Sequence, residues 1–212
     1  FISFWSLSEK VCIRALHLNN SESYCAIQVR VDQNVVVVAA TNGTIECYSL
    51  DKMTLKGVIK PEVNATVECV LLDSTNPNLL FVLFSSGQLV YYNLSLFVVV
   101  KLITLESSGF ENGNSKITQL IGRSYLVLSK GGLYLLDTIQ DSCVLLSSFS
   151  KISGMTDLES ISDISVCNEC VCISYHCRNS DVLLGFTSTQ FAAFSEPVCP
   201  HWHIPLPSAA SR

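Results

Sequence analysis

The stretch VVVVAATNGTIECYSL, residues 35–50, decides the fold class. It contains a short apolar run, a turn that includes Gly43, and a second run that ends on Tyr48 and Ser49. Two such runs, separated by a few residues that include glycine, are typical of a β-hairpin, because glycine adopts the positive φ that a tight turn needs. The stretch therefore predicts two adjacent antiparallel strands.

The same pattern returns twice further along the chain. LLFVLFSSGQLVYYNL begins at Leu79 and RSYLVLSKGGLYLLDT begins at Arg123, so the copies start 44 residues apart, with Gly43, Gly87 and Gly131 in register. Partial copies flank them: FISFWSL (1–7) at the start and DVLLGFTSTQFAAFS (181–195) near the end. Turn signals divide the second full unit into four predicted strands, Thr66–Leu72, Leu79–Phe84, Gln88–Leu94 and Phe97–Leu105.

Four short antiparallel strands per unit, at a period of about 44 residues, indicate an all-β chain built as a partial β-propeller of four-stranded blades. We expect residues 1–196 to form this partial propeller, with about four to five blades of which the first and last are incomplete. The pattern suggests a fragment of a larger ring. Residues 197–212 are Pro-rich, and we expect a loosely ordered tail there.

The units resemble degenerate WD-repeat blades. A glycine precedes the third strand in three units, and an aromatic residue stands where the family's Trp usually ends that strand: Trp5, Tyr48, Tyr92 and Phe194. Of the Trp-Asp pair only Asp137 supplies the acid, after Leu136, and the family's Gly-His pair does not occur. The resemblance implies a rigid scaffold whose connecting loops bind partners. It also predicts Trp5 in the core.

Composition narrows the class of protein further. The chain is 49% hydrophobic and 15% charged, so it must bury much of its surface or meet a partner. The longest apolar runs, Val35–Ala40, Leu79–Phe84 and Leu94–Val100, are far shorter than a membrane span of roughly 20 residues and instead predict buried strands. Asp and Glu outnumber Lys and Arg by 18 to 13, which disfavours a nucleic-acid partner.

The ten cysteines are best explained as small buried hydrophobes. Cys47 aligns with Tyr91 and Leu135 in the repeat, and Cys12 aligns with Leu55 and Val99, so cysteine exchanges with apolar residues. Equivalent positions in neighbouring blades are usually too far apart for a disulfide. We therefore expect free thiols and an intracellular compartment, either cytoplasm or nucleus.

One dense cluster of chemistry offers an alternative. VCNECVCISYHC, residues 166–177, could combine Cys167, Cys170 and Cys177 with His201 or His203 as four zinc ligands. However, Cys170 and Cys172 alternate with Val171 and Ile173, which is strand spacing, and a single C-x-x-C is a weak zinc signal. We favour a strand, the first of the fifth unit, and expect no metal and no cofactor.

The function that these patterns favour is a non-catalytic scaffold that mediates protein–protein interactions in a larger intracellular complex. No nucleophile elbow or phosphate-binding glycine loop occurs in the sequence. The segments Ser107–Lys116 and Ser150–Ser160 depart most from the repeat, and we expect them to be loops that contact a protein partner. Within them, Glu111, Lys116, Asp157 and Glu159 are the candidate binding residues. The alternative is a zinc-binding or enzymatic module on residues 167–203.

Overall fold

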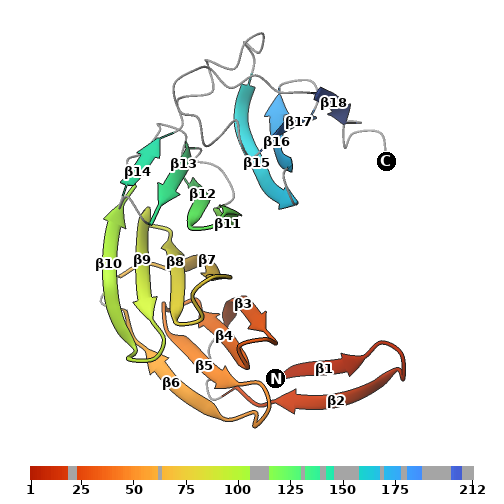
Figure 1. Ribbon diagram of the computed structural model, residues 1–212, viewed down its shortest axis with the longest axis vertical. Coiled ribbons are helices and arrows are strands. Elements are labelled where there is room, and N and C mark those ends of the chain that lie inside the picture. Colours follow the sequence, from red (N-terminus) through yellow and green to blue (C-terminus); the bar gives the residue numbers. More distant parts are fainter. Residues whose placement is uncertain are drawn as a thin grey trace. The chain divides into compact units, whose positions relative to one another are not determined.

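The chain is built from β-strands that pair with their neighbours in the sequence (Figure 1). The computed structural model describes residues 1–18, 23–61, 64–105, 115–129, 132–138, 142–145, 158–167, 170–177, 181–187 and 202–206. Over these ranges no helix is long and apolar enough to cross a membrane. The strands form four four-stranded antiparallel sheets and one two-stranded sheet, which we call blades 1 to 5 in chain order.

Each blade takes consecutive strands. Blade 1 holds β1 (Ile2–Ser6) and β2 (Val11–Leu16), and blade 2 holds β3 (Tyr24–Arg30), β4 (Val35–Ala40), β5 (Ile45–Ser49) and β6 (Leu55–Ile59). Blade 3 holds β7 (Val67–Leu72), β8 (Leu79–Phe84), β9 (Gln88–Asn93) and β10 (Val98–Thr104). Blade 4 holds β11 (Lys116–Ile121), β12 (Ser124–Ser129), β13 (Gly132–Asp137) and β14 (Ser142–Leu145), and blade 5 holds β15 (Leu158–Cys167), β16 (Cys170–Cys177), β17 (Asp181–Thr187) and β18 (Trp202–Leu206).

The middle strands of each blade carry the apolar runs. Every residue of β4 and β5 is buried, and so are all but the first of β8, which confirms Val35–Ala40 and Leu79–Phe84 as buried strands. Tyr48 and Tyr92, at the position of the family's Trp, are also buried. A strand covered on both faces has no polar side, and this explains why the runs are continuous rather than alternating.

The chain divides into two compact units, residues 1–102 and 103–212, each with its own core. In the first unit, Val37 and Cys47 of blade 2 pack in one cluster with Leu80 and Val82 of blade 3. In the second unit, Leu126 and Leu135 of blade 4 pack with Val171, Ile173 and Phe186 of blade 5. Burial of a Val, Leu or Phe side chain contributes about 1.5–3 kcal/mol, so these blade-to-blade contacts dominate the stability of each unit.

Two kinds of turn repeat through the first unit. Gly43 and Gly87, in the hairpins between second and third strands, have φ of 89° and 81°, as the sequence pattern predicts. The turn between third and fourth strands places Lys10, Met53 and Phe97 at φ of 56°, 52° and 54°, although none is a glycine. These residues are 43 and 44 positions apart, so the turn repeats with the blades.

One residue and one segment that the sequence predicts to be buried lie at the surface instead. Trp5 is 60% exposed, because Phe4 of the same strand packs towards blade 2 and alternation turns Trp5 to the other face. Of the run Leu94–Val100, only Leu94 is buried: Val98, Val99 and Val100 belong to β10, an edge strand. Apolar residues occupy both faces of this strand, so its sequence resembles that of a middle strand.

The fifth blade is shifted from the predicted register. The structure places Leu158–Cys167 as its first strand and Cys170–Cys177 as its second. Leu158, Glu159 and Ser160 therefore lie in a strand rather than a loop, while the predicted third strand around Phe191 and Phe194 lies outside the described residues. The predicted loose tail is wrong at Trp202–Leu206, which pairs with β17 and satisfies the hydrogen bonds of its otherwise open edge.

We predict that Gly57→Ala, in β6, destabilises the first unit. A Cβ at this position would overlap the ring of Phe97, which comes from the third-to-fourth turn of blade 3. Overpacking of this kind costs about 1–3 kcal/mol, measured as the free energy of unfolding in urea. In a Phe97→Ala background the same substitution should cost nothing, whereas an equal cost in both backgrounds would contradict the contact.

Candidate interaction surface

The outer strand of blade 3 exposes an unusual row of apolar side chains. In β10, Val98, Val99, Val100 and Leu102 are 49%, 54%, 59% and 47% exposed, and Leu96 in the preceding turn is 68% exposed. Lys101 is the only charged residue of this strand. β10 is also the last strand of its sheet, so its outward backbone N–H and C=O groups have no partner within that sheet. An apolar edge of this kind is suited to pairing with another strand.

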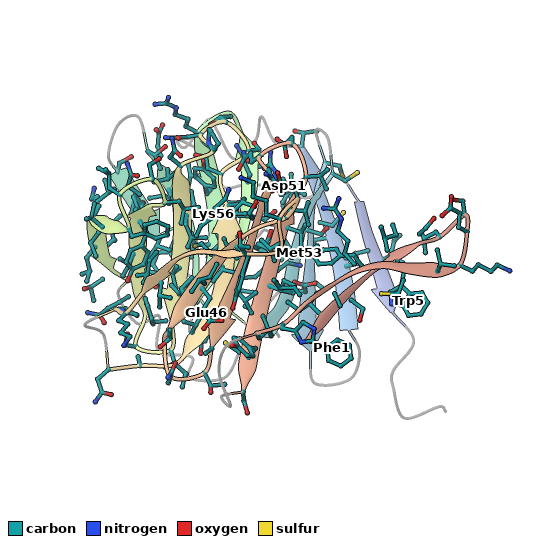
Figure 2. The ribbon with its side chains drawn as sticks, turned by 90° about the horizontal axis from the view of Figure 1, so that it is seen from below. Phe1, Trp5, Glu46, Asp51, Met53 and Lys56 are labelled. Carbon is teal, nitrogen blue, oxygen red and sulfur yellow. The ribbon has the colours of Figure 1, made fainter. Side chains whose placement is uncertain are left out.

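A second exposed apolar group lies on blade 1. Trp5 of β1 and Val11 and Ile13 of β2 are 60%, 49% and 59% exposed. Figure 2 shows Trp5 on the β1–β2 ribbon, apart from the side chains of the blade 2 sheet. Tryptophan is enriched at protein interfaces because it combines a large apolar ring with one hydrogen-bond donor.

Polar contacts hold blade 1 against blade 2. The Arg14 guanidinium, from β2, donates to the backbone oxygens of Leu50 at 2.9 Å and Asp51 at 2.8 Å. Next to these carbonyls, Met53 packs against the apolar cluster that contains Leu16 and Tyr48. The turn at residues 50–53 therefore serves as a contact point between neighbouring blades, as Phe97 over Gly57 does one blade further on.

Asp51 organises this turn. Its carboxylate Oδ1 accepts hydrogen bonds from the Ser49 hydroxyl and the Lys52 backbone N–H, and its own N–H donates to Asn34 Oδ1 at 2.7 Å. Hydrogen bonds from Ser49 and then Asn34 lower the pKa of Asp51 to about 2. Lys56 donates to the backbone oxygen of Asn34 at 3.1 Å, which ties β6 to the first turn of the blade.

A buried carboxylate lies near the other end of β5 (Figure 2). Glu46 is only 2% exposed, and its Oε2 accepts hydrogen bonds from the hydroxyls of Tyr48 at 2.6 Å and Tyr24 at 2.9 Å. Burying a carboxylate is costly unless donors surround it, and the two phenols supply them. The network joins the first and third strands of blade 2, so it has a structural role.

The predicted loop residues are only partly placed by the structure. Lys116 begins β11 and forms an ion pair with Asp163 of β15 at 2.8 Å, which links the first strands of blades 4 and 5. Both side chains are largely exposed, and pairs of this kind contribute at most about 1 kcal/mol. Glu111 and Asp157 lie outside the described residues, as does the side chain of Glu159. Their role in partner binding stays a prediction.

The Cys/His cluster is brought together in part. Cys167 and Cys170 are direct cross-strand partners at the β15–β16 turn, and the Cys172 sulfur lies 3.9 Å from that of Cys170. His201 and the side chains of His203 and Cys177 are outside the described part of the chain. Among the side chains that are described, no group of three or more His, Cys, Asp or Glu is arranged to hold a metal ion. The zinc alternative thus stays untested at two of its four ligands.

The other cysteines differ in burial. Cys47 is buried as expected, and burial raises the pKa of its thiol to about 12. Cys12 and Cys25 are exposed, which corrects their assignment to the core. Cys25 is skipped in the β3–β4 register, so it occupies a bulge, where its thiol donates to the backbone oxygen of Val67 at 3.2 Å. A repeat alignment does not reveal such a bulge.

Comparison with solved structures agrees with this architecture. The chain superposes on the β-propeller domain of Cps50 (Swd1) from Myceliophteria thermophila with a TM-score of 0.67, at 8% identity, over 90% of this chain and 57% of that one. It superposes on the WD40 repeats of RRP9 with a TM-score of 0.61, at 14% identity, over 82% and 53%. The fold is that of a β-propeller with four-stranded blades, like these two domains. No protein-family model and no curated protein sequence matches the chain.

The propeller described here spans little more than half the length of these two solved chains. At identities this low the likeness establishes the fold, and the blade pattern of the sequence is confirmed by it. The exposure of β2, of β10 and of Trp5 in β1 was not predicted, because β2 and β10 are nearly as apolar in sequence as the buried strands and Trp5 lies in the repeat register.

We predict that Asp51 contributes stability that depends on pH. Its folded pKa of about 2 lies below the ordinary value near 4, so the contribution is complete above about pH 5 and is lost as the pH falls from about 4 to about 2. Urea unfolding of the protein and of Asp51→Asn should therefore give a difference in free energy that is constant at neutral pH and shrinks in that acidic window.

Adding salt tests whether hydrogen bonds or interactions between charges cause the pH dependence at Asp51. Hydrogen bonds from the neutral Ser49 and Asn34 side chains dominate the lowered pKa of Asp51, so the pH dependence should survive high salt, which screens interactions between exposed charges. A difference that does not change between pH 5 and pH 2 would contradict the role given to this carboxylate.

Proposed function

We propose that this propeller is a non-catalytic scaffold that binds proteins within a larger intracellular complex. The WD40-type fold supports a function of this kind. The composition agrees with it, since 49% of residues are hydrophobic and only 15% are charged. Eight cysteines in the described part form no disulfide, a state that reducing compartments maintain.

The observation that carries the proposal is the set of exposed apolar side chains on both faces of β10. Single exposed apolar residues are ordinary, but a contiguous row of Val98, Val99, Val100 and Leu102 on an open sheet edge marks an interaction site or an aggregation hazard. Natural edge strands are usually protected by charges or proline, whereas β10 has one lysine and no proline. An extended segment of a partner protein could pair with this edge and cover the valines.

A set of matched variants tests this proposal. Val98→Thr, Val100→Thr and Leu102→Thr together replace three of the four exposed apolar side chains of β10, and threonine keeps a high strand propensity. The control changes Leu55→Thr and Val58→Thr on β6, the equivalent outer strand of blade 2, whose side chains are 40% and 38% exposed. Proteins bound to each tagged variant in cells are quantified by cross-linking and mass spectrometry.

We expect partners to be lost from the β10 variant and kept by the β6 variant. A third variant with the charges of Glu111, Lys116, Asp157 and Glu159 reversed tests the loops as the binding site. Loss of partners in this variant alone would move the interface to the loops. An unchanged set of partners in all three variants would contradict both binding sites, and a chain that binds no protein in cells would contradict the proposed function.

A further inference from the structure

The tip of the β15–β16 hairpin brings three thiols to one face of blade 5. In β16, Val171 and Ile173 are buried in the apolar cluster with blade 4, so alternation places Cys170 and Cys172 on the opposite face. Cys167 is paired directly across from Cys170, and directly opposed residues of an antiparallel pair share a face. The three thiols therefore lie together on the side away from the core of this unit.

The strand geometry selects one pair of these thiols for a covalent bond. Directly opposed residues of antiparallel strands have Cα atoms about 4.5–5.5 Å apart, which falls within the 4.4–6.8 Å range of disulfides. Cys170 and Cys172 are two positions apart on one strand, a Cα separation of about 6.6–6.8 Å, at the upper end of that range. Cys167 and Cys170 are therefore the favoured partners.

The surroundings of the three thiols differ in a way that matches this choice. Cys167 is exposed and accessible to a soluble oxidant, while Cys170 and Cys172 are partly covered.

We propose that Cys167 and Cys170 are a reversible oxidation site, which forms a disulfide across the hairpin tip with a peroxide as oxidant. The Cys167 thiolate attacks one oxygen of hydrogen peroxide and becomes a sulfenic acid, and the other oxygen leaves as hydroxide. The Cys170 sulfur then attacks the sulfenic sulfur, forms the S–S bond and releases water. In total, two thiols lose two electrons and two protons, and one peroxide is reduced to two waters.

The position of Glu169 between the two cysteines provides a direct test. The 212-residue chain is treated with hydrogen peroxide, its remaining thiols are blocked with N-ethylmaleimide, and it is cut after glutamate without reduction. Because proteolysis after glutamate does not occur at the Glu196–Pro197 bond, the two peptides are 160–169 and 170–212, and they separate unless Cys167 is bonded to the second peptide. We expect the two peptides as one linked species, lighter by two hydrogens than their sum, with maleimide on Cys172, Cys177 and Cys199.

Variants identify the bonded sulfurs. Cys172→Ser should keep the linked species, Cys167→Ser should abolish it, and dithiothreitol should release both peptides from the oxidised protein. The proposal is overturned if Cys167 is recovered with maleimide after peroxide treatment, or if fragmentation places the link on Cys172 or Cys177.

Discussion

Packing of one sheet against the next is the interaction on which this structure depends. An isolated two-stranded or four-stranded sheet exposes both of its faces to water. The apolar side chains of β4, β5, β8 and β9 would then be exposed, which is unfavourable. When blade 2 packs on blade 3, Val37 and Cys47 meet Leu80 and Val82, and the middle strands become covered. The repeat of about 44 residues exists because each blade must present the same faces to its neighbours.

Secondary contacts adjust how the blades meet. Arg14 reaches two carbonyls of the 50–53 turn, and Phe97 covers Gly57, so the third-to-fourth turn of a blade repeatedly touches the blade before it. The left-handed conformation of Met53 and Phe97 is unfavourable for such side chains, and these contacts compensate for it. The packed inner faces leave some apolar residues exposed, and those of β2 and β10 with Trp5 of β1 are among the most exposed, so a partner protein could cover them there.

The sequence predicted the elements that the repeat determines. The strand bounds of blade 3 and the hairpin glycines Gly43 and Gly87 follow from the 44-residue register. The exposed strands could not be predicted in the same way. The sequence VVVKLIT of β10 lacks the alternation of apolar and polar residues that would distinguish an edge strand from a buried one. The bulge at Cys25 and the strand at Leu158–Cys167 depend on pairing with β4 and β16, which a single sequence does not display.

Amide hydrogen exchange on the 212-residue chain, followed by mass spectrometry, tests the central claim most directly, because protection reports which strands are held by neighbouring sheets. The account predicts slow exchange across β4, β5, β8 and β9 and fast exchange along β2 and β10, whose outer edges are open. Protection of β10 equal to that of β8 and β9 in the isolated protein would contradict it.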